Sequence, residues 1–488
     1  MRFQTTLRVL QDRGLVRRRV SRFSNDEEGA LTIFACFMVF LMLMVCGIAV
    51  DLMQNEMMRT RVQNTLDRAI LAASDLEQPL PPDDVVDDYF AKAGMSEFLE
   101  NVQITPGADL PTTNYRIVQA TARTQTPSIY MAMSGVNSLP VFAAGTAEEV
   151  IENTEISLVI DISGSMRNNK KMDNLRIAAK EFIATVLEGN AAKTTSLNIV
   201  PYAGQVNPGP IIFNRASGNP FATYITNDEG EEELYGYTYI DDEGNEIVVP
   251  YNTIAHCLEL ENGDFDNMNL PSGGYDQVPY FMNWKIAADV MDWGWCPQDN
   301  SAIRYAQNSI SELQTFIDEI RMHDGTGTHY GMKYGVALLN PSSNDAFREL
   351  HTAGLVQDGF EDRPKPFDGK DVRKYIVLMT DGQITDQYRP DDPNDSENPT
   401  VVLNNRKDEK IKRTKRSENL ESFYSACDLA EENDIIVYTI AFEAPASAQT
   451  EMKNCANPST NYYKVEGVAI ATVFKAIARQ INELRLVQ

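Results

Sequence analysis

The stretch Glu155-Ile-Ser-Leu-Val-Ile-Asp161-Ile-Ser163-Gly-Ser165-Met166 decides the fold of this chain. Its apolar part, Ile156 to Ile160, does not alternate strongly with polar residues, which is typical of a buried strand. After Ser165, apolar residues recur at helical spacing at Leu175, Ala178, Ala179, Phe182, Ile183 and Val186. A carboxylate and two hydroxyls therefore lie on a loop between a strand and a helix, at the edge of an open α/β sheet where ligands bind.

The side chains of Asp161, Ser163 and Ser165 are oxygen donors suited to a hard divalent cation. They do not close a coordination shell, so they leave room for water and for an outside ligand, as Mg²⁺ sites usually do. The alternative interpretation is that Ser163 or Ser165 only caps the following helix. The pattern Asp161-x-Ser163-x-Ser165 resembles the metal-ion-dependent adhesion site of von Willebrand factor type A domains.

Two later segments resemble the other loops of that site. A second apolar strand ends in Thr380-Asp381-Gly382, and Gly325-Thr-Gly-Thr-His-Tyr-Gly331 resembles the loop that supplies a threonine. The spacing to Gly331 favours Thr326 as the family threonine, with Thr328 as its rival. The resemblance implies that a partner's acidic residue completes the shell of one Mg²⁺ (or Mn²⁺ or Ca²⁺), which is held by Asp161, Ser163, Ser165, Thr326 and Asp381.

Length and charge limit the possible functions. The chain has 488 residues, which exceeds one ordinary domain, and its net charge is −27, from 43 Lys and Arg against 70 Asp and Glu. Such an acidic balance argues against a nucleic-acid partner, which would require a basic surface.

The N-terminal region has the pattern of a membrane anchor. Seven arginines and no lysine occur in residues 1–28, and residues 30–50 then carry no charge. These 21 residues form a helix of about 30 Å, enough to cross the inner membrane. The alternatives are a cleaved signal peptide or a buried helix. We expect a retained single-pass anchor, with the N-terminus in the cytoplasm and the bulk of the chain periplasmic or extracellular.

The block from Gly29 to about Ala73 resembles the N-terminal module of TadG-like proteins of Tad/Flp pilus assembly. The family pattern is a membrane helix, then Val-Asp, then a helical segment with Leu-Gln and Asp. Val50-Asp51, Val62-Gln63, Asp67 and Leu71-Ala72 match it, whereas Arg68 and Ile70 depart from it. Leu66, Ala69, Ile70 and Ala73 share one helical face, so we expect the membrane helix to continue outward.

We therefore expect a von Willebrand factor A fold, a Rossmann-like, open and mostly parallel α/β sheet, preceded by one transmembrane helix and a small β-containing stalk. The expected boundaries are 1–28 for the basic segment, 29–75 for the anchor and its extension, 76–150 for a linker and the stalk, and 151–488 for the A domain, with an insertion at about 207–303. Residues 78–90 are predicted as linker, and the apolar spacing from Ile303 to Ile320 predicts one long helix.

Four of the six cysteines lie outside the predicted span, and none has the spacing of a zinc site. An even number in an oxidising compartment favours disulfides, and free thiols are the alternative. The resemblance to TadG-like proteins pairs Cys427 with Cys455, which leaves Cys257 to pair with Cys296.

The function that follows is that of a non-catalytic pilus-assembly or adhesion component. A surface adhesin for host matrix is one alternative, and a metal-dependent hydrolase is another. A hydrolase needs a general base beside the metal. His329 is the histidine found next to a metal loop, and we expect it to be a surface or packing residue. The basic run from Arg406 to Arg416 is expected to be solvated surface, although it could also meet an acidic partner.

Overall fold

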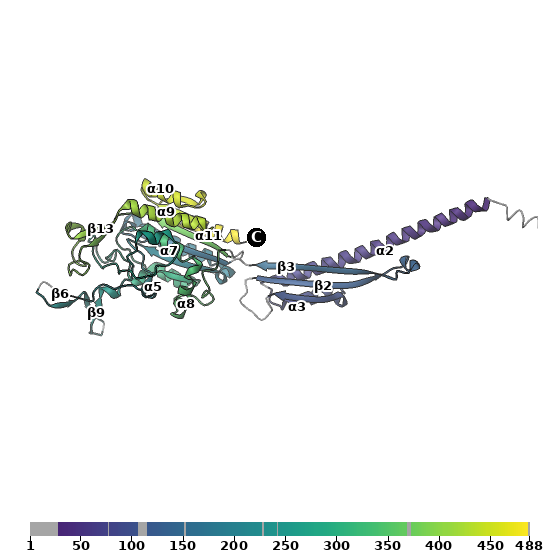
Figure 1. Ribbon diagram of the computed structural model, residues 1–488, viewed down its shortest axis with the longest axis horizontal. Coiled ribbons are helices and arrows are strands. Elements are labelled where there is room, and N and C mark those ends of the chain that lie inside the picture. The colour runs from purple at the N-terminus through teal and green to yellow at the C-terminus, as the bar shows by residue number, and fades with distance from the viewer. Residues whose placement is uncertain are drawn as a thin grey trace, which may run out of the picture. The chain divides into compact units, whose positions relative to one another are not determined.

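The computed structural model describes residues 28–76, 78–105, 115–150, 153–226, 229–241, 243–367 and 372–486. The chain divides into two compact units, residues 1–150 and 151–488, and Figure 1 shows the elements of each. The seven arginines of the predicted cytoplasmic segment lie outside the described residues.

The first unit combines one long helix with a three-stranded antiparallel sheet of order β1-β2-β3. The helix, α2, is the one helix in the described ranges that is long and apolar enough to cross a membrane. Beyond the apolar run, the predicted face of Leu66, Ala69, Ile70 and Ala73 is buried in the core of the unit, which confirms that the helix continues past that run. The elements are α2 (Glu28–Ser74), α3 (Pro82–Lys92), β1 (Leu99–Thr105), β2 (Tyr115–Pro127) and β3 (Ser138–Val150).

The linker predicted for residues 78–90 is wrong from Pro82 onward, because this segment forms helix α3. Pro82 stands at the first helical position, and Asp83 and Asp84 lie in the first turn, where proline and acidic residues favour a helix start. Val85, Val86 and Phe90 are buried against α2 and the sheet. Proline and aspartate are common in linkers too, so only the buried face distinguishes the two.

The second unit is built on a six-stranded sheet of order β10-β5-β4-β11-β14-β15. All neighbouring strands are parallel except β10, which runs antiparallel to β5. Helices α4, α6 and α11 cover one face, while α5, α7, α8, α9 and α10 pack on the other. The predicted fold class, an open and mostly parallel α/β sheet with a single apolar helix before it, is confirmed. The strands are β4 (Asn153–Asp161), β5 (Thr195–Tyr202), β10 (Arg304–Gln307), β11 (Val372–Thr380), β14 (Ile436–Phe442) and β15 (Tyr462–Val465).

Helices separate most of the consecutive strands of the sheet, and α6, α7 and α8 follow one another between β10 and β11. Strand β4 alternates its side chains between two hydrophobic cores, with Val159 facing one and Leu158 and Ile160 facing the other. The helices are α4 (Lys171–Val186), α5 (Gly209–Arg215), α6 (Ile310–Glu319), α7 (Thr328–Ala337), α8 (Asn344–Thr352), α9 (Arg416–Glu432), α10 (Ala446–Cys455) and α11 (Ala469–Leu486).

The long helix predicted from Ile303 to Ile320 is wrong in its first part. Residues Arg304–Gln307 form strand β10, and α6 begins only at Ile310. The edge of β5 offers free backbone groups, and β10 pairs with it, Arg304 opposite Ile199. Tertiary pairing therefore overrides a local spacing that also fits a helix.

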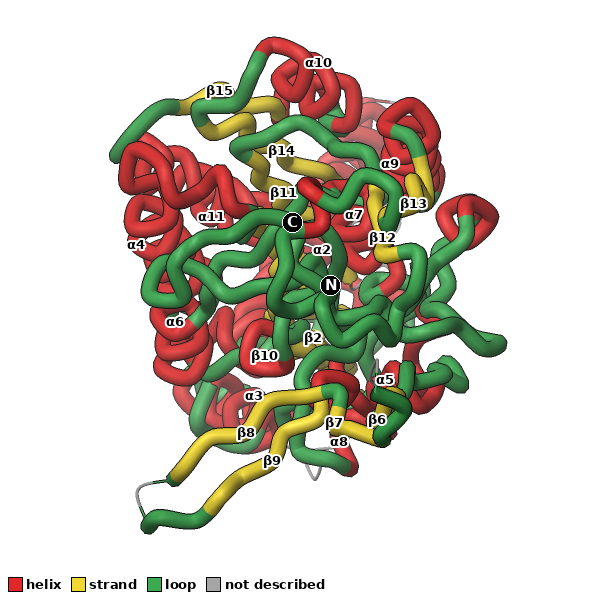
Figure 2. Tube along the Cα trace, turned by 90° about the vertical axis from the view of Figure 1, so that its left-hand side faces the viewer, coloured by secondary structure: helices red, strands yellow, loops and turns green. Residues whose placement is uncertain are grey.

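The segment between β5 and β10 carries two small hairpins, and Figure 2 shows the β8–β9 hairpin extending away from the sheet. A disulfide joins Cys257 to Cys296 within this segment, and a second joins Cys427 on α9 to Cys455 at the end of α10. Both are the pairs expected from the sequence. The remaining strands are β6 (Tyr224–Thr226), β7 (Glu232–Leu234), β8 (Gly236–Ile240), β9 (Glu246–Pro250), β12 (Gln387–Pro390) and β13 (Lys410–Thr414).

Candidate metal centre

Two carboxylates lie together because two neighbouring strands end at the same edge. Strands β4 and β11 are parallel, with Met379 opposite Ile160. Asp161 is the last residue of β4, and Asp381 directly follows β11. The chain turns to one side of β4 to form β5 and later returns on its other side as β11. This is the switch point at which open α/β sheets bind ligands.

Asp161 is fully buried, and both of its carboxylate oxygens accept hydrogen bonds. Its Oδ1 accepts a hydrogen bond from the backbone N–H of Ser163 at 2.8 Å, and its Oδ2 accepts one from the Thr380 hydroxyl at 2.7 Å. Burial, and then the negative charge of Asp381, raises the pKa of Asp161 to about 7. The carboxylate pair therefore carries negative charge that its surroundings do not fully balance.

The two serines of the first loop connect the carboxylates. Ser163 Oγ lies 3.0 Å from Ser165 Oγ, and Ser165 Oγ donates to Asp381 Oδ1 at 2.5 Å. Ser163 precedes a short 3₁₀ segment, Gly164–Lys170, and its side chain makes no capping hydrogen bond to it. The Ser163 side chain thus points into the cluster instead of capping the helix.

The threonine loop is held against the other two loops by backbone hydrogen bonds. The N–H of His323 donates to Ile162 O at 2.9 Å, and the N–H of Thr385 donates to Thr326 O at 3.1 Å. A Cβ placed on Gly382 would lie 3.5 Å from Thr326 Oγ1 and 3.6 Å from Ser165 Oγ. Thr326 therefore faces the same point as Ser165.

Thr328, the rival to Thr326, lies in the first turn of α7. It is buried, and its hydroxyl adjoins that of Tyr202. The Tyr202 hydroxyl in turn lies 3.4 Å from Asp161 Oδ2 and donates to Met379 O at 3.0 Å. These contacts bring Asp161, Ser163, Ser165, Thr326 and Asp381 together, whereas the Thr328 hydroxyl adjoins Tyr202.

Lys171 is a member of the cluster that sequence reasoning missed. It is the first residue of α4, it is buried, and its Nζ lies 3.0 Å from Asp381 Oδ2. One ammonium against two carboxylates leaves one negative charge in the cluster. No motif marks Lys171, because a lysine at the start of a helix usually points into solvent.

Two histidines lie next to these loops, where only His329 was expected. His329 is buried with its ring 5.4 Å from that of Phe265, and burial, with the nearby Arg389, lowers its pKa to about 3. It is a packing residue. His323 pairs with Ser163 in an isolated bridge, and burial lowers its pKa to about 4. Both rings are therefore neutral near pH 7.

The donor set fits a hard cation. Within the ranges that the structure covers, no group of three or more His, Cys, Asp or Glu side chains is placed to hold a metal ion. The cluster offers two carboxylates and three hydroxyls instead, and all are the oxygen donors that Mg²⁺ and Ca²⁺ take. A divalent cation would also balance the charge that raises the pKa of Asp161. The residues present thus fit Mg²⁺, Mn²⁺ or Ca²⁺.

A basic pocket of about 350 Å³ adjoins the first loop, and its lining includes Arg167, Lys170, Arg176 and Arg321. Arg167 Nη1 donates to Gly164 O at 2.9 Å, so its guanidinium lies over the residue between the two serines. Arg176 lies 3.7 Å from Asp173 and Arg321 lies 2.7 Å from Asp292, so two of these four cations are paired within the unit, and Asp289 also lines the pocket. Arg167 and Lys170 provide the positive charge next to the first loop. Such a pocket suits an anionic group next to the cluster.

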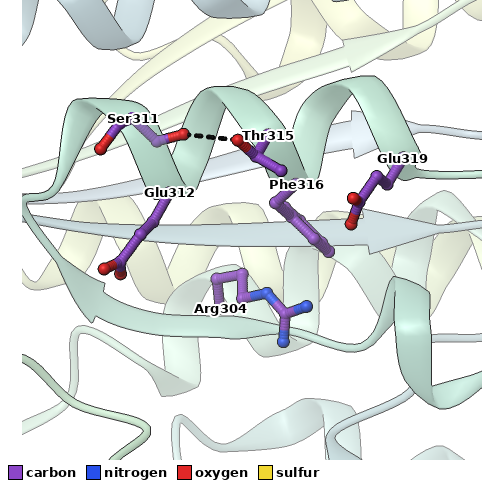
Figure 3. Close-up of a pocket in the computed structure, with 6 residues that line it drawn as sticks. All are labelled: Arg304, Ser311, Glu312, Thr315, Phe316 and Glu319. Carbon is purple, nitrogen blue, oxygen red and sulfur yellow. Dashed lines mark hydrogen bonds between the residues drawn. The ribbon is translucent and has the colours of Figure 1, made fainter.

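A second pocket of similar volume lies between β10 and α6 (Figure 3). The Arg304 guanidinium stands over the Phe316 ring at 4.2 Å, and burial lowers its pKa. Glu312 and Glu319 line the same pocket. Two carboxylates against one guanidinium provide no positive field, so we assign no anionic ligand there.

Four of the seven cations in the basic run from Arg406 to Arg416 pair with carboxylates of their own unit. Arg406 contacts Asp395 and Glu409, and Arg413 contacts Glu261. Lys412 and Arg416 pair with Asp386 and Glu451. This pairing reduces the positive charge that the run offers to an acidic partner.

The comparison with family models agrees with the resemblance stated above for the N-terminal block. The family of Flp pilus-assembly TadE/G-like proteins matches residues 29–75, which confirms the predicted resemblance of this block. No curated protein matches the chain.

Among solved structures, the chain is similar to the vWF domain of the type V pili tip protein Mfa5 from Porphyromonas gingivalis, at 11% identity and a TM-score of 0.34, covering 68% of this chain and 96% of that one. It is similar to the pilus adhesin SpaC from Lactobacillus rhamnosus GG, at 12% identity and a TM-score of 0.31, covering 78% of this chain and 34% of that one. It is also similar to proximal thread matrix protein 1 from the mussel byssus, in a structure with a zinc-occupied MIDAS motif. The identity is 10% and the TM-score 0.27, and the match covers 67% of this chain and 47% of that one. The chain thus spans about a third of SpaC and nearly all of the Mfa5 domain.

Proposed function

We propose that this protein is a membrane-anchored, non-catalytic component of a Tad-type pilus machine that binds an acidic partner through a divalent cation. The observation that carries the proposal is the cluster at the ends of β4 and β11. There, Ser163 and Ser165 link Asp161 to Asp381, and Thr326 faces the same point. The match of residues 29–75 to the TadE/G-like family supports the pilus role.

In this proposal one Mg²⁺, or Mn²⁺ or Ca²⁺, is held by Asp161, Ser163, Ser165, Thr326 and Asp381, some of them through water. Hydroxyls are neutral ligands, so the two aspartates supply the negative charge. With Lys171 included, two carboxylates, one ammonium and a divalent cation give the loaded site one net positive charge. A partner's aspartate or glutamate is the ligand that such a site attracts.

The basic pocket beside the first loop supports an acidic partner. Arg167 and Lys170 follow the metal-binding serines within five residues of sequence, and both are exposed. A second carboxylate on the partner would find these cations while the first occupies the metal. In a chain of net charge −27, this positive surface stands out from its surroundings.

Catalysis is not part of the proposal. Metal-assisted hydrolysis needs a base or nucleophile that can reach the substrate. His329 packs against Phe265, and His323 is buried with Asp292 at 3.9 Å from its Nε2. A surface adhesin for host matrix would use the same metal chemistry, and the family match favours the pilus machine over it.

For localisation, we propose that residues 30–50 anchor the chain in the inner membrane, with its N-terminus in the cytoplasm and the bulk of the chain outside. The two disulfides support an oxidising compartment for the second unit. Protease added to spheroplasts should digest residues 100–488. Protection of these residues would contradict this orientation.

Calorimetry of Mg²⁺ binding by the full chain in nanodiscs tests the metal. We expect one Mg²⁺ per chain, removed by EDTA, and a loss of at least about 100-fold in affinity, or ~3 kcal/mol, in Asp161→Ala. Asp173→Ala is the matched control, since Asp173 is exposed and lies two residues beyond Lys171. Equal Mg²⁺ binding by Asp161→Ala and the wild type would show that the cluster is only structural.

A capture experiment tests the partner. The wild-type chain is incubated with an envelope extract in Mg²⁺ and then in EDTA, and bound proteins are identified by mass spectrometry. The proposal expects a pilus component that is lost in EDTA and in Asp161→Ala. Retention of the same partner in EDTA would separate partner binding from the metal.

A further inference from the structure

The turn between β2 and β3, residues 128–137, is apolar and exposed. Met133 is 69% exposed and Ile129 is 65% exposed, while Tyr130 and Val136 are 41% and 38% exposed. The sequence between Arg123 and Glu148 contains no charged residue. Large apolar side chains gathered on one exposed turn usually mark a contact surface.

Asp51 fixes this turn to helix α2. Its carboxylate accepts hydrogen bonds from the backbone N–H groups of Ile129, Tyr130 and Met131 at 3.1, 2.8 and 2.7 Å. Asp51 is buried and directly follows the charge-free run of residues 30–50. The turn is therefore fastened to the helix at the position where the predicted membrane span ends. Figure 1 shows the connected strands β2 and β3 beside α2.

The ring of Tyr130 reaches back over the span itself. A Cβ placed on Gly47 would lie 2.4 Å from Tyr130 Cδ1 and Cγ, so only a glycine permits this approach. Gly47 lies four residues before Asp51, or about 6 Å along the helix. The ring thus rests on the last turn of the apolar run. Tyrosine is enriched at this level of membrane proteins because its ring is apolar and its hydroxyl meets water.

We propose that the turn of residues 128–137 is a second membrane contact that enters the bilayer interface beside the anchor. The occupant of this surface is the lipid bilayer, because the turn is continuous with the charge-free run and carries no charge of its own. Ile129 and Met133 would enter the acyl boundary, with Tyr130 at the headgroup level. The proposal rests on the predicted anchor and is independent of the metal site.

The contact has a consequence for the first unit. A single transmembrane helix can rotate and tilt relative to its bilayer. A second contact, fastened by three hydrogen bonds, would hold the sheet of this unit in one orientation against the membrane surface.

Spin labelling tests the contact directly. The full chain carries Cys36→Ala and Cys46→Ala, since these are the free cysteines, and one new cysteine at Met133 or Ile129 receives a nitroxide. The chain is reconstituted in vesicles of phosphatidylethanolamine and phosphatidylglycerol. Relaxation by oxygen, which concentrates in lipid, is compared with relaxation by a water-soluble nickel chelate.

We expect labels at Met133 and Ile129 to be relaxed more by oxygen than by the nickel chelate, as a label at Phe40→Cys in the span should be. A label at Leu80→Cys, an exposed site in the same unit, is the aqueous control. If the Met133 label behaves like the Leu80 label, the turn lies in water and the proposal fails. If oxygen and nickel are both excluded, protein covers the turn, and this outcome also overturns the proposal.

Asp51→Asn tests whether the carboxylate positions the turn. An amide has one acceptor oxygen, so it cannot serve all three N–H donors. The oxygen-to-nickel ratio at Met133 should fall toward the Leu80 value, while the ratio at Phe40 stays unchanged. An unchanged ratio at Met133 would show that Asp51 does not hold the turn at the membrane.

Discussion

Asp51 and Asp161 are both buried aspartates that directly follow an uncharged apolar run, yet their surroundings differ in kind. Three backbone N–H groups surround Asp51. Asp161 receives one backbone N–H and faces the second carboxylate, Asp381. A buried carboxylate that backbone N–H groups satisfy has a structural role, whereas one placed beside a like charge is stabilised by binding a proton or a cation.

The same contrast explains why the two regions would respond to different changes. Backbone N–H groups of the turn of residues 128–137 satisfy the Asp51 carboxylate, so this region requires no bound ion. The Asp161 cluster contains Lys171 as its one cation and keeps a negative charge. On the metal proposal, Mg²⁺ should stabilise the second unit and leave the first unchanged.

The largest expected effect is that of Mg²⁺ on the second unit. A ligand at about 100 times its Kd stabilises the folded state by about 2.7 kcal/mol. Hydrogen exchange of the amides of β4 and β11 should therefore slow by about 100-fold, with no change in the first unit. Asp161→Asn should abolish the effect and Asp51→Asn should preserve it. An equal response of the two variants would end the comparison.

The next effect is the loss of the hydrogen bonds to Asp51. Hydrogen bonds to a charged group contribute about 1.5–3 kcal/mol each. In Asp51→Asn the amides of Ile129, Tyr130 and Met131 should exchange at least about 30-fold faster, which corresponds to ~2 kcal/mol. Exchange measured by mass spectrometry on peptides covering the β2–β3 turn provides the test. Asp67→Asn, on the same helix, is the control, and equal exchange in Asp51→Asn and the wild type would contradict a structural role for Asp51.

Lys171 should weaken metal binding, because its ammonium repels a cation held by Asp381. Lys171→Met keeps the length of the side chain and removes the charge. We expect Mg²⁺ to bind about tenfold more tightly, or ~1.4 kcal/mol, in calorimetry. Lys180→Met on the same helix is the control, since Lys180 pairs with Asp318. A weaker Mg²⁺ affinity in Lys171→Met would show instead that the lysine organises the site.

The smallest expected effect is a fall in the stability of the metal-free protein as pH rises, measured in EDTA. Burial and Asp381 raise the pKa of Asp161 to about 7, whereas an aspartate of an unfolded chain titrates near 3.9. The folded protein thus binds the Asp161 proton more tightly than the unfolded chain does. The stabilisation from this bound proton is present at low pH and is lost as pH rises through about 7. Thermal unfolding between pH 5 and 8 should show the fall, and Asp161→Asn should flatten it. A wild-type curve as flat as that of the variant would contradict the charge imbalance.

Much of the fold could be predicted from local patterns. The buried strand from Ile156 to Ile160 and the aspartates that follow the apolar strands are short-range features. They led to Asp161, Ser163 and Asp381 as candidate ligands. The helix over Pro82–Lys92 and the strand over Arg304–Gln307 were missed. Proline and aspartate serve linkers and helix starts alike, and the pairing of β10 depends on a free edge of β5.

The apolar strands, the anchor-like run, the order of the three loops and their oxygen donors could all be predicted from the amino-acid sequence, because these features depend on neighbours within a few residues. Tertiary structure alone decided that Lys171 meets Asp381, 210 residues away, and that Asp51 meets Tyr130, 79 residues away. Such contacts depend on which strands pair and in which register, and no local pattern encodes the distance between residues on separate elements. The charge balance of the candidate site and the position of the β2–β3 turn on the helix are therefore properties of the folded chain.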